Sequence, residues 1–277
     1  MMPVRYVNNR GHEANMAGSG VWCDSGEWQD WAYEYSTMNG RVSSFRRGIT
    51  ERELTFIVVG PSREAAADTR NRLYSVMSAD IADKKAGRLY VGEWFVRCWC
   101  IESKKDDYWI SPIASKHTVN VLMEDPAWMR ERSYDFYPTS GGTSSGLDYP
   151  FDFEFDFSGT GQAGEVAIES VRPCAVSITV FGPATNPRVE VGGNAYEVDV
   201  TVPDGGILFI DGLSKTVEMR TVDGVVTNEY GKTPDGYEGS GDYIFERLGP
   251  GLVEVSWPGT FGFRLDTYEA ADERPWI

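Results

Sequence analysis

The second half of this 277-residue chain contains many short runs of β-branched and aromatic residues, and Gly or Pro separates almost every run from the next. No helical periodicity interrupts these runs. Short strands at this spacing are typical of an antiparallel β-sandwich. The expected strands cover residues 165–171, 175–181, 189–191, 196–202, 206–210, 216–220, 243–247, 252–257 and 261–266.

The run that opens this half, residues 149–157, reads Tyr-Pro-Phe-Asp-Phe-Glu-Phe-Asp-Phe. Because successive side chains of a strand point to opposite faces, its phenylalanines would share one face and its acids the other. We interpret the run as the opening strand of the sandwich. The phenylalanines Phe151, Phe153, Phe155 and Phe157 would anchor the core, and the acids Asp152, Glu154 and Asp156 would lie in solvent.

Two other interpretations of these three acids stay open, a cation site and the carboxylate pair of an inverting glycosidase. Same-face neighbours on a strand lie about 6.6 to 6.8 Å apart. This spacing falls within the separation of about 6.5 to 9.5 Å that inverting glycosidases require. Any strand with acids on its exposed side meets the same criterion, so the solvated face is the favoured interpretation.

The first half combines strand patterns with a single convincing helix. Ser62 is a good N-cap for a helix over 63–81, whose apolar stripe we expect to comprise Ala66, Leu73, Met77 and Ile81. Strands flanking one helix indicate an α+β module. The expected strands cover residues 4–7, 28–35, 52–59, 88–101 and 117–125, with a tight turn at Gly92-Glu93.

Charge divides the chain near the same place as the strand pattern. Residues 1–149 hold 18 Lys and Arg against 20 Asp and Glu, whereas 150–277 hold 8 against 22, for a net charge of −16. The Gly- and Ser-rich stretch 139–146 has the composition of a flexible connector. We therefore expect a first domain at 1–138, a linker at 139–148 and a second domain at 149–277. The acidic half should repel nucleic acid and anionic membranes.

Histidines are scarce. Both of them, His12 and His117, lie in the first half, so the acidic half by itself can host neither a Ser-His-Asp triad nor a histidine metal site. His117 lies in a predicted strand, where we expect a partly exposed structural residue.

The four cysteines are too few and too irregularly spaced for a disulfide framework or a zinc site. We expect Cys23, Cys98, Cys100 and Cys174 to be reduced and buried, because free Cys behaves as a small apolar residue. The sequence thus predicts no catalytic residue, no cofactor and no bound metal.

The N-terminal residues Met-Met-Pro-Val-Arg-Tyr lack the apolar core of a signal peptide. No stretch of the chain approaches the run of about 18 apolar residues that a membrane span requires. We expect a soluble protein made in a cytoplasm, with no membrane partner.

Tryptophans are concentrated in the first half, which holds seven of the nine. Large amphipathic rings suit both protein cores and subunit interfaces. The strand pattern on either side of Gly92-Glu93 predicts an aromatic hairpin over residues 89–99. We expect this aromatic hairpin to contribute to packing or assembly through Leu89, Tyr90, Trp94, Phe95 and Trp99.

The order of several short motifs is informative. The helix leads through Lys-Ala-Gly (85–87) into Arg-Leu-Tyr-Val (88–91), and strand 119–123 ends in Glu-Asp-Pro-Ala-Trp (124–128). Later motifs are Asn186-Pro187, Gly-Ile-Leu-Phe-Ile-Asp (206–211) before Lys-Thr-Val (215–217), and Leu-Gly-Pro-Gly-Leu (248–252). In this order the chain resembles the distal tail proteins of long-tailed phages that infect Gram-positive bacteria, the siphophage tail component family.

The resemblance implies a mainly β fold with one helix, in which an N-terminal ring-forming α+β domain precedes a galectin-like antiparallel β-sandwich. It also implies a non-enzymatic virion protein that is assembled in the host cytoplasm and located in the tail. Such a protein forms a six-membered ring, joins the tail tube to the tail tip or baseplate and to receptor-binding proteins, and lets genome DNA pass without specific binding.

The alternative is a carbohydrate-binding protein that recognises host cell-wall polysaccharide through its second half. Galectins that bind sugar use a His, Asn and Arg cluster with a stacked Trp. This half of the chain has no His, and Trp257 before Pro258 has the pattern of a core residue at a strand end. A hydrolase that uses the acids of 152–156 is a third and more distant interpretation.

Overall fold

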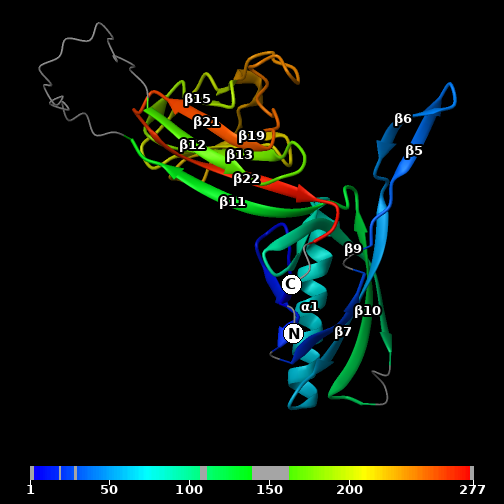
Figure 1. Ribbon diagram of the computed structural model, residues 1–277. Helices are drawn as coiled ribbons and strands as arrows, with labels where there is room; N and C mark the ends of the chain where they lie inside the picture. The colour runs from blue at the N-terminus through cyan, green and yellow to red at the C-terminus, as the bar shows by residue number, and fades with distance from the viewer. Residues whose placement is uncertain (1–2, 19, 28–29, 107–110, 139–161, 275–277) are drawn as a thin grey trace, which may run out of the picture. The chain divides into compact units, whose positions relative to one another are not determined.

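The computed structural model describes residues 3–18, 20–27, 30–106, 111–138 and 162–274 (Figure 1). Two compact units comprise Met1–Arg130 with Ala271–Ile277, and Glu131–Ala270. The first division falls earlier in the chain than the predicted 139–148 linker. That linker and the alternating run 149–157 lie outside the described residues, so the predicted domain limits and the opening strand stay predictions.

The first unit is built on an antiparallel sheet with the strand order β9-β10-β7-β4-β3. A smaller antiparallel set places β1 between β2 and β8, and β8 pairs with the first part of β9. The bounds are β1 Val4–Val7, β2 Glu13–Asn15, β3 Ala17–Gly18, β4 Val21–Gly26, β7 Thr50–Val59, β8 Gly87–Val91, β9 Trp94–Asp106 and β10 Ala114–Met123.

Helix α1 (Arg63–Asp83) packs beside β7 and β9 and closes the core of this unit. The Ser62 side chain accepts a hydrogen bond from the Ala65 N–H at 3.2 Å and caps the helix as expected. The buried face comprises Ala66, Leu73, Val76, Met77 and Asp80. The expectation for Ile81 is wrong, because this side chain is 48% exposed while the face continues through Val76 to Asp80.

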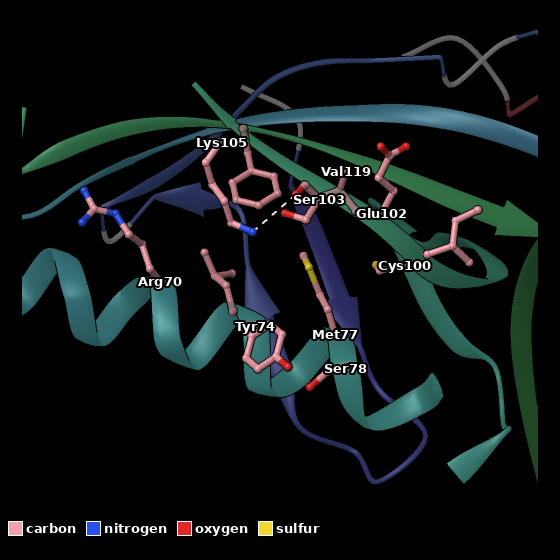
Figure 2. A pocket seen from close by; sticks show the side chains of 12 residues that line it. Arg70, Tyr74, Met77, Ser78, Cys100, Glu102, Ser103, Lys105 and Val119 are labelled. Atoms are coloured by element: carbon pink, nitrogen blue, oxygen red, sulfur yellow. Dashed lines mark hydrogen bonds between the residues drawn. The ribbon is translucent and has the colours of Figure 1, made fainter. Parts of the chain in front are cut away.

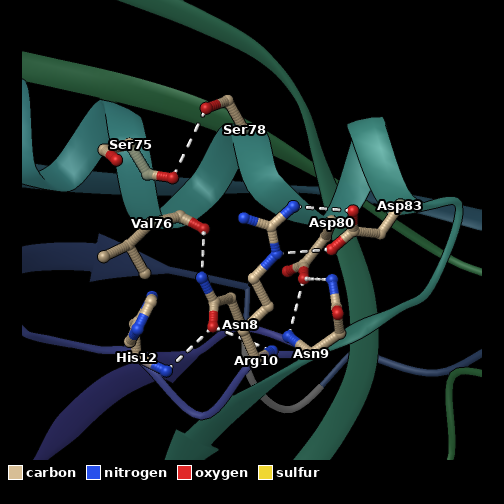
Figure 3. Close-up of polar contacts among 9 residues, drawn as sticks. All are labelled: Asn8, Asn9, Arg10, His12, Ser75, Val76, Ser78, Asp80 and Asp83. Carbon is tan, nitrogen blue, oxygen red and sulfur yellow. Dashed lines mark hydrogen bonds and ion pairs between the residues drawn. The ribbon is translucent and has the colours of Figure 1, made fainter.

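A buried polar cluster joins the last turns of α1 to the loop after β1 (Figure 3). The Asp80 carboxylate accepts hydrogen bonds from the Tyr6 hydroxyl at 2.5 Å and from the backbone and side-chain N–H groups of Asn9 at 2.7 and 2.6 Å. Asn8 donates to the Val76 carbonyl at 3.2 Å. These contacts explain why an acid occupies a fully buried position of the helix.

The second unit is a β-sandwich. One sheet has the order β20-β19-β18-β13-β22, with β11 beside β22, and the other has the order β12-β21-β15-β16. A single apolar core draws residues from both sheets, among them Ile178, Leu265, Val255 and Tyr196. The bounds are β11 Trp128–Phe136, β12 Gln162–Ile168, β13 Ala175–Phe181, β15 Arg188–Val191, β16 Asn194–Glu197, β18 Ile207–Asp211, β19 Thr216–Arg220, β20 Val226–Asn228, β21 Gly251–Trp257 and β22 Gly262–Ala271.

Three short elements complete the second unit. Strands β14 (Ala184–Thr185) and β17 (Thr201–Val202) pair with each other, and a 3-10 helix covers Tyr230–Lys232. The described part of the chain is therefore mainly β with one α-helix, which confirms the predicted fold class.

Two predicted strands are wrong, and a third, 196–202, is interrupted, because β16 ends at Glu197, β17 covers only Thr201–Val202, and residues 198–200 form no strand. Residues 243–247 form turns, with a hydrogen bond from the Glu246 N–H to the Tyr243 carbonyl at 3.1 Å. Ile244 and Phe245 are nevertheless buried, so the apolar pattern reported burial correctly and conformation incorrectly. In the stretch 28–35, residues 30–33 have no regular structure, and the strand there is β5 (Glu34–Met38).

Candidate functional site

The described residues contain no group of three or more His, Cys, Asp or Glu side chains placed to hold a metal ion. The acids Asp152, Glu154 and Asp156 lie outside the described residues. No helix in the described part of the chain has the length and apolar composition needed to cross a bilayer. The remaining candidates are the histidines, the cysteines and the exposed apolar surfaces.

His117 is 4% exposed, so the expectation of partial exposure is wrong. Its ring stacks on Phe56 with centroids 5.2 Å apart, and its Nε2 lies 2.8 Å from the Ser115 hydroxyl. The residue is buried because β10 pairs with β7 on one side and with β9 on the other. Burial, with smaller contributions from Lys105 and Arg70, lowers the pKa of His117 to about 4. The ring is thus neutral at pH 7 and part of the core.

His12 lies in the turn after β1, where its backbone N–H donates to the Asn8 side chain at 2.8 Å. This contact involves the backbone of His12 and not its ring.

All four cysteines are free, and Cys98 and Cys174 are buried as expected. Cys23 and Cys100 are partly exposed, so the expectation of full burial is wrong for these two. Burial raises the pKa of Cys23 and Cys174 to about 11 and that of Cys100 to about 12. Because the thiolate is the reactive form, these thiols are poor nucleophiles at neutral pH.

The predicted aromatic hairpin exists, with β8 and β9 joined at Gly92-Glu93. Leu89 and Phe95 are fully buried within the monomer. Tyr90, Trp94 and Trp99 are partly exposed. Arg5 stacks over the Tyr90 ring at 4.1 Å, and Arg130 over the Trp94 ring at 5.3 Å. The interface prediction for this hairpin stays a prediction, and the partly exposed rings are its accessible members.

Sequence reasoning did not predict a second hairpin, formed by β5 and β6 (Arg41–Arg46). Figure 1 shows it extending away from the helix-covered part of the first unit. Every residue of both strands is exposed, including four large apolar side chains, Tyr35, Met38, Val42 and Phe45. Tyr35 and Phe45 lie directly opposite each other.

The base of this hairpin is anchored to its own unit. The Tyr33 hydroxyl donates to Asp272 at 2.6 Å, and Arg47 forms an ion pair with Asp272 at 2.9 Å. An exposed two-stranded hairpin is marginally stable in water by itself. Its apolar side chains and open edges are therefore suited to contact another molecule.

A sequence signal for this hairpin exists. Asn39 and Gly40 both have positive φ, 54° and 73°, as a type I′ turn requires. The dipeptide Asn-Gly is the strongest short-range hairpin signal, and here it lies between two strand-forming runs.

The sequence matches no protein-family model and no curated protein. Comparison with solved structures finds extensive similarity. The Dit (gp 19.1) protein of phage SPP1, described as a paradigm of the hub adsorption apparatus in phages infecting Gram-positive bacteria, aligns with a TM-score of 0.53 and 11% identity over 98% of this chain and 99% of that one.

A chain of the phage P2 baseplate, in its activated conformation with Ca, aligns with a TM-score of 0.64 and 11% identity over 99% of each chain. The same baseplate with Sr gives 0.63 and 10% identity over 99% of this chain and 100% of that one. This chain has the fold of phage hub proteins. The resemblance to distal tail proteins is thus confirmed at the level of the fold.

Proposed function

We propose that this chain is a structural, non-enzymatic protein of a phage tail that assembles with copies of itself into a ring. The ring would be the distal hub, six-membered as in the resembling family, that joins the tail tube to the tail tip or baseplate and to receptor-binding proteins. The observation that carries the proposal is the fold, which matches a hub protein and baseplate chains over nearly the full length of both partners.

The β5–β6 hairpin supports self-assembly. Its exposed apolar residues lie on a hairpin that extends from the first unit. They can therefore contact a neighbouring copy. A contact between two different surfaces of identical chains generates a closed ring when the rotation between copies closes. Genome DNA would pass through such a ring without specific binding, because an acidic protein repels phosphate.

Native mass spectrometry of the purified chain tests this proposal. We expect a cyclic homo-oligomer, with the hexamer as the main species. A double variant Tyr35→Ser and Phe45→Ser should raise the protein concentration needed for assembly at least tenfold, because it removes two large apolar side chains from the contact. Its matched control is Tyr237→Ser, which changes a 74% exposed aromatic residue of the second unit. A chain that stays monomeric at all concentrations would contradict the proposal.

The carbohydrate-binding alternative is less well supported. Trp257 is 8% exposed and packs edge to face against Phe136 and Phe263, with centroids 5.2 and 5.3 Å away. A ring in this position has no free face for stacking on a sugar. Glycan-array binding by a monomeric chain would favour this alternative over the ring.

A further inference from the structure

The first unit contains a groove between helix α1 and the second part of strand β9 (Figure 2). Its volume is about 180 Å³. The floor is apolar and comprises Phe56, Leu73, Met77 and Val119. At its mouth, Tyr74 is 71% exposed and Ile101 is 43% exposed.

One wall of the groove is an open strand edge. Residues 99–106 of β9 pair with β10, whereas β8 pairs only with residues 94–98. No described strand pairs with the second edge of residues 99–106. Such an edge offers N–H and C=O groups to an added strand, and a neighbouring apolar groove accepts alternate side chains of that strand.

One end of the groove is positively charged. Arg70 donates to the Ser115 hydroxyl at 2.8 Å, and Lys105 donates to the Ser103 carbonyl at 3.4 Å. Both cations lower the pKa of His117, and each effect is larger than the opposite effect of the acid Asp106. Among the lining residues the acid is Glu102, which accepts a hydrogen bond from Asn120 at 2.7 Å and lies 3.4 Å from Lys104.

Register places the basic end on the groove side of β9. Ser103 lies opposite the buried Val119 and Lys105 opposite the buried His117, so both face the helix. Lys104 lies opposite Thr118 and faces the other side. An acid on the groove-facing side of an added strand would therefore meet Lys105, in a chain whose net charge of −16 otherwise disfavours acidic ligands.

We propose that this groove binds an extended segment of a partner protein, which adds as a strand to the open edge of β9. The segment carries large apolar residues at alternate positions, which fill the groove above Leu73 and Met77. On the same face it carries an acid that pairs with Lys105 and Arg70. This peptide-binding site goes beyond the proposed ring, because its ligand is a different protein.

A peptide titration on the full-length chain tests the proposal. The probe is acetyl-Glu-Thr-Phe-Thr-Phe-Thr-Glu-Thr-amide, labelled for fluorescence anisotropy. Its Phe and Glu residues share one face, and a Glu at each end allows either strand direction. We expect saturable binding, together with slower amide hydrogen exchange over residues 99–106. Absence of binding to the wild-type chain would overturn the proposal.

Charge exchange separates the site from general stickiness. Lys105→Glu should weaken binding of the Glu peptide about tenfold and should strengthen binding of a peptide with Lys in place of Glu. The matched control Lys104→Glu changes the same charge one residue away on the opposite face, and we expect less than a twofold change. Equal losses for the two variants would overturn the proposal.

A last variant tests whether the groove binds a separate partner or the chain's own alternating run at 149–157. The variant in which Phe151, Phe153, Phe155 and Phe157 are replaced by Ser should bind the probe as the wild type does. Probe binding that appears only in this variant would show that the chain occupies its own groove, and it would overturn the assignment to a separate partner.

Discussion

At the scale of single residues, buried polar groups hold the N-terminal strands of the first unit against its helix. Asp80 accepts three hydrogen bonds from Tyr6 and Asn9. Burial raises the pKa of the Tyr6 phenol well above its usual range, so the phenol stays protonated and donates. A cluster in which each donor has an acceptor specifies how the loop after β1 meets the helix.

Replacing Asp80 with Ala should lower the free energy of unfolding by about 3 kcal/mol, because it leaves the buried Tyr6 hydroxyl and the two partly buried N–H groups of Asn9 without their acceptor. Urea denaturation measures this loss. Asp83→Ala is the control. Asp83 lies on the same helix as Asp80 but forms an exposed ion pair, with Arg10 at 2.7 Å. We expect a much smaller loss for the control. Similar losses for both variants would contradict a special role of Asp80.

His117 should make stability depend on pH. Its pKa is lowered from 6.5 to about 4 in the folded chain, so the folded state favours the neutral ring. Stability is therefore full above about pH 6.5, and it falls as the pH is lowered toward 4 because the unfolded chain takes up the proton first. The loss over this window is about 3 kcal/mol.

The variant His117→Phe removes this titration, and the control His12→Phe retains it. Urea unfolding at intervals between pH 7 and pH 4 should show a shallower decline for His117→Phe than for the wild type and the control. Parallel curves for all three proteins would show that His117 does not titrate as described.

At the scale of elements, helix α1 begins where a side-chain cap satisfies its first turn. Ser62 has extended backbone angles, φ −142° and ψ 167°, and its hydroxyl accepts from the Ala65 N–H. The helix ends at Lys84, whose positive φ of 54° lets its N–H bond the carbonyls of Asp80 and Ile81. Both ends of α1 are thus determined by local backbone hydrogen bonds.

Ser62→Ala should cost about 1 kcal/mol of stability, the usual value for loss of an N-cap, whereas Ser62→Gly should cost a few tenths. The matched control is Ser75→Ala, an exposed substitution in the middle of the helix, where Ala has the higher helix propensity. Chemical denaturation should therefore show destabilisation by Ser62→Ala and none by Ser75→Ala. Equal effects would indicate that the cap contributes nothing.

At the scale of the whole molecule, charge and fold support the same proposal. The chain carries 42 acids against 26 bases, and the excess lies in the second half. Such a net charge is compatible with an assembly that surrounds DNA without holding it, since phosphate binding depends on clustered cations. In the proposed assembly, the carboxylates would also limit association with nucleic acid.

We expect the purified chain, assembled or not, to leave duplex DNA unshifted in an electrophoretic assay at about 0.15 M salt. Lowering the salt should produce no binding, because the interaction is repulsive at every ionic strength. A shift that weakens as salt rises would reveal a cationic surface and would contradict free passage of DNA.

Sequence patterns correctly predicted the elements that are determined by residues close together in the chain. The strands at 175–181 and 216–220 have the predicted bounds, because β-branched runs ended by turn residues need no other information. The helix begins at Arg63 as predicted, since the cap and the first turn are adjacent in sequence. The β5–β6 hairpin could have been predicted from Asn39-Gly40.

Other features depend on residues far apart in the chain. Residues 243–247 have a strand-like composition but form turns, and nothing local distinguishes the two. Asp80, and not Ile81, lies on the buried face of α1 because Tyr6 and Asn9 donate hydrogen bonds to it. These partners lie more than seventy residues earlier, so the local sequence of the helix does not reveal them. The groove beside β9 likewise exists because β8 ends its pairing at Cys98 while β10 continues to Asp106.

The sequence by itself determined the class of the fold, the single helix, the charge division and the resemblance to distal tail proteins, because composition and local periodicity carry that information. Only the tertiary structure decided which surfaces are free to act. Burial of Leu89, Phe95 and His117 and the open edge of β9 follow from strand pairing between distant segments. Tyr35 and Phe45 are exposed because no other described strand pairs with the β5–β6 hairpin. The physical reason is that exposure is a property of the packed chain rather than of any residue in it.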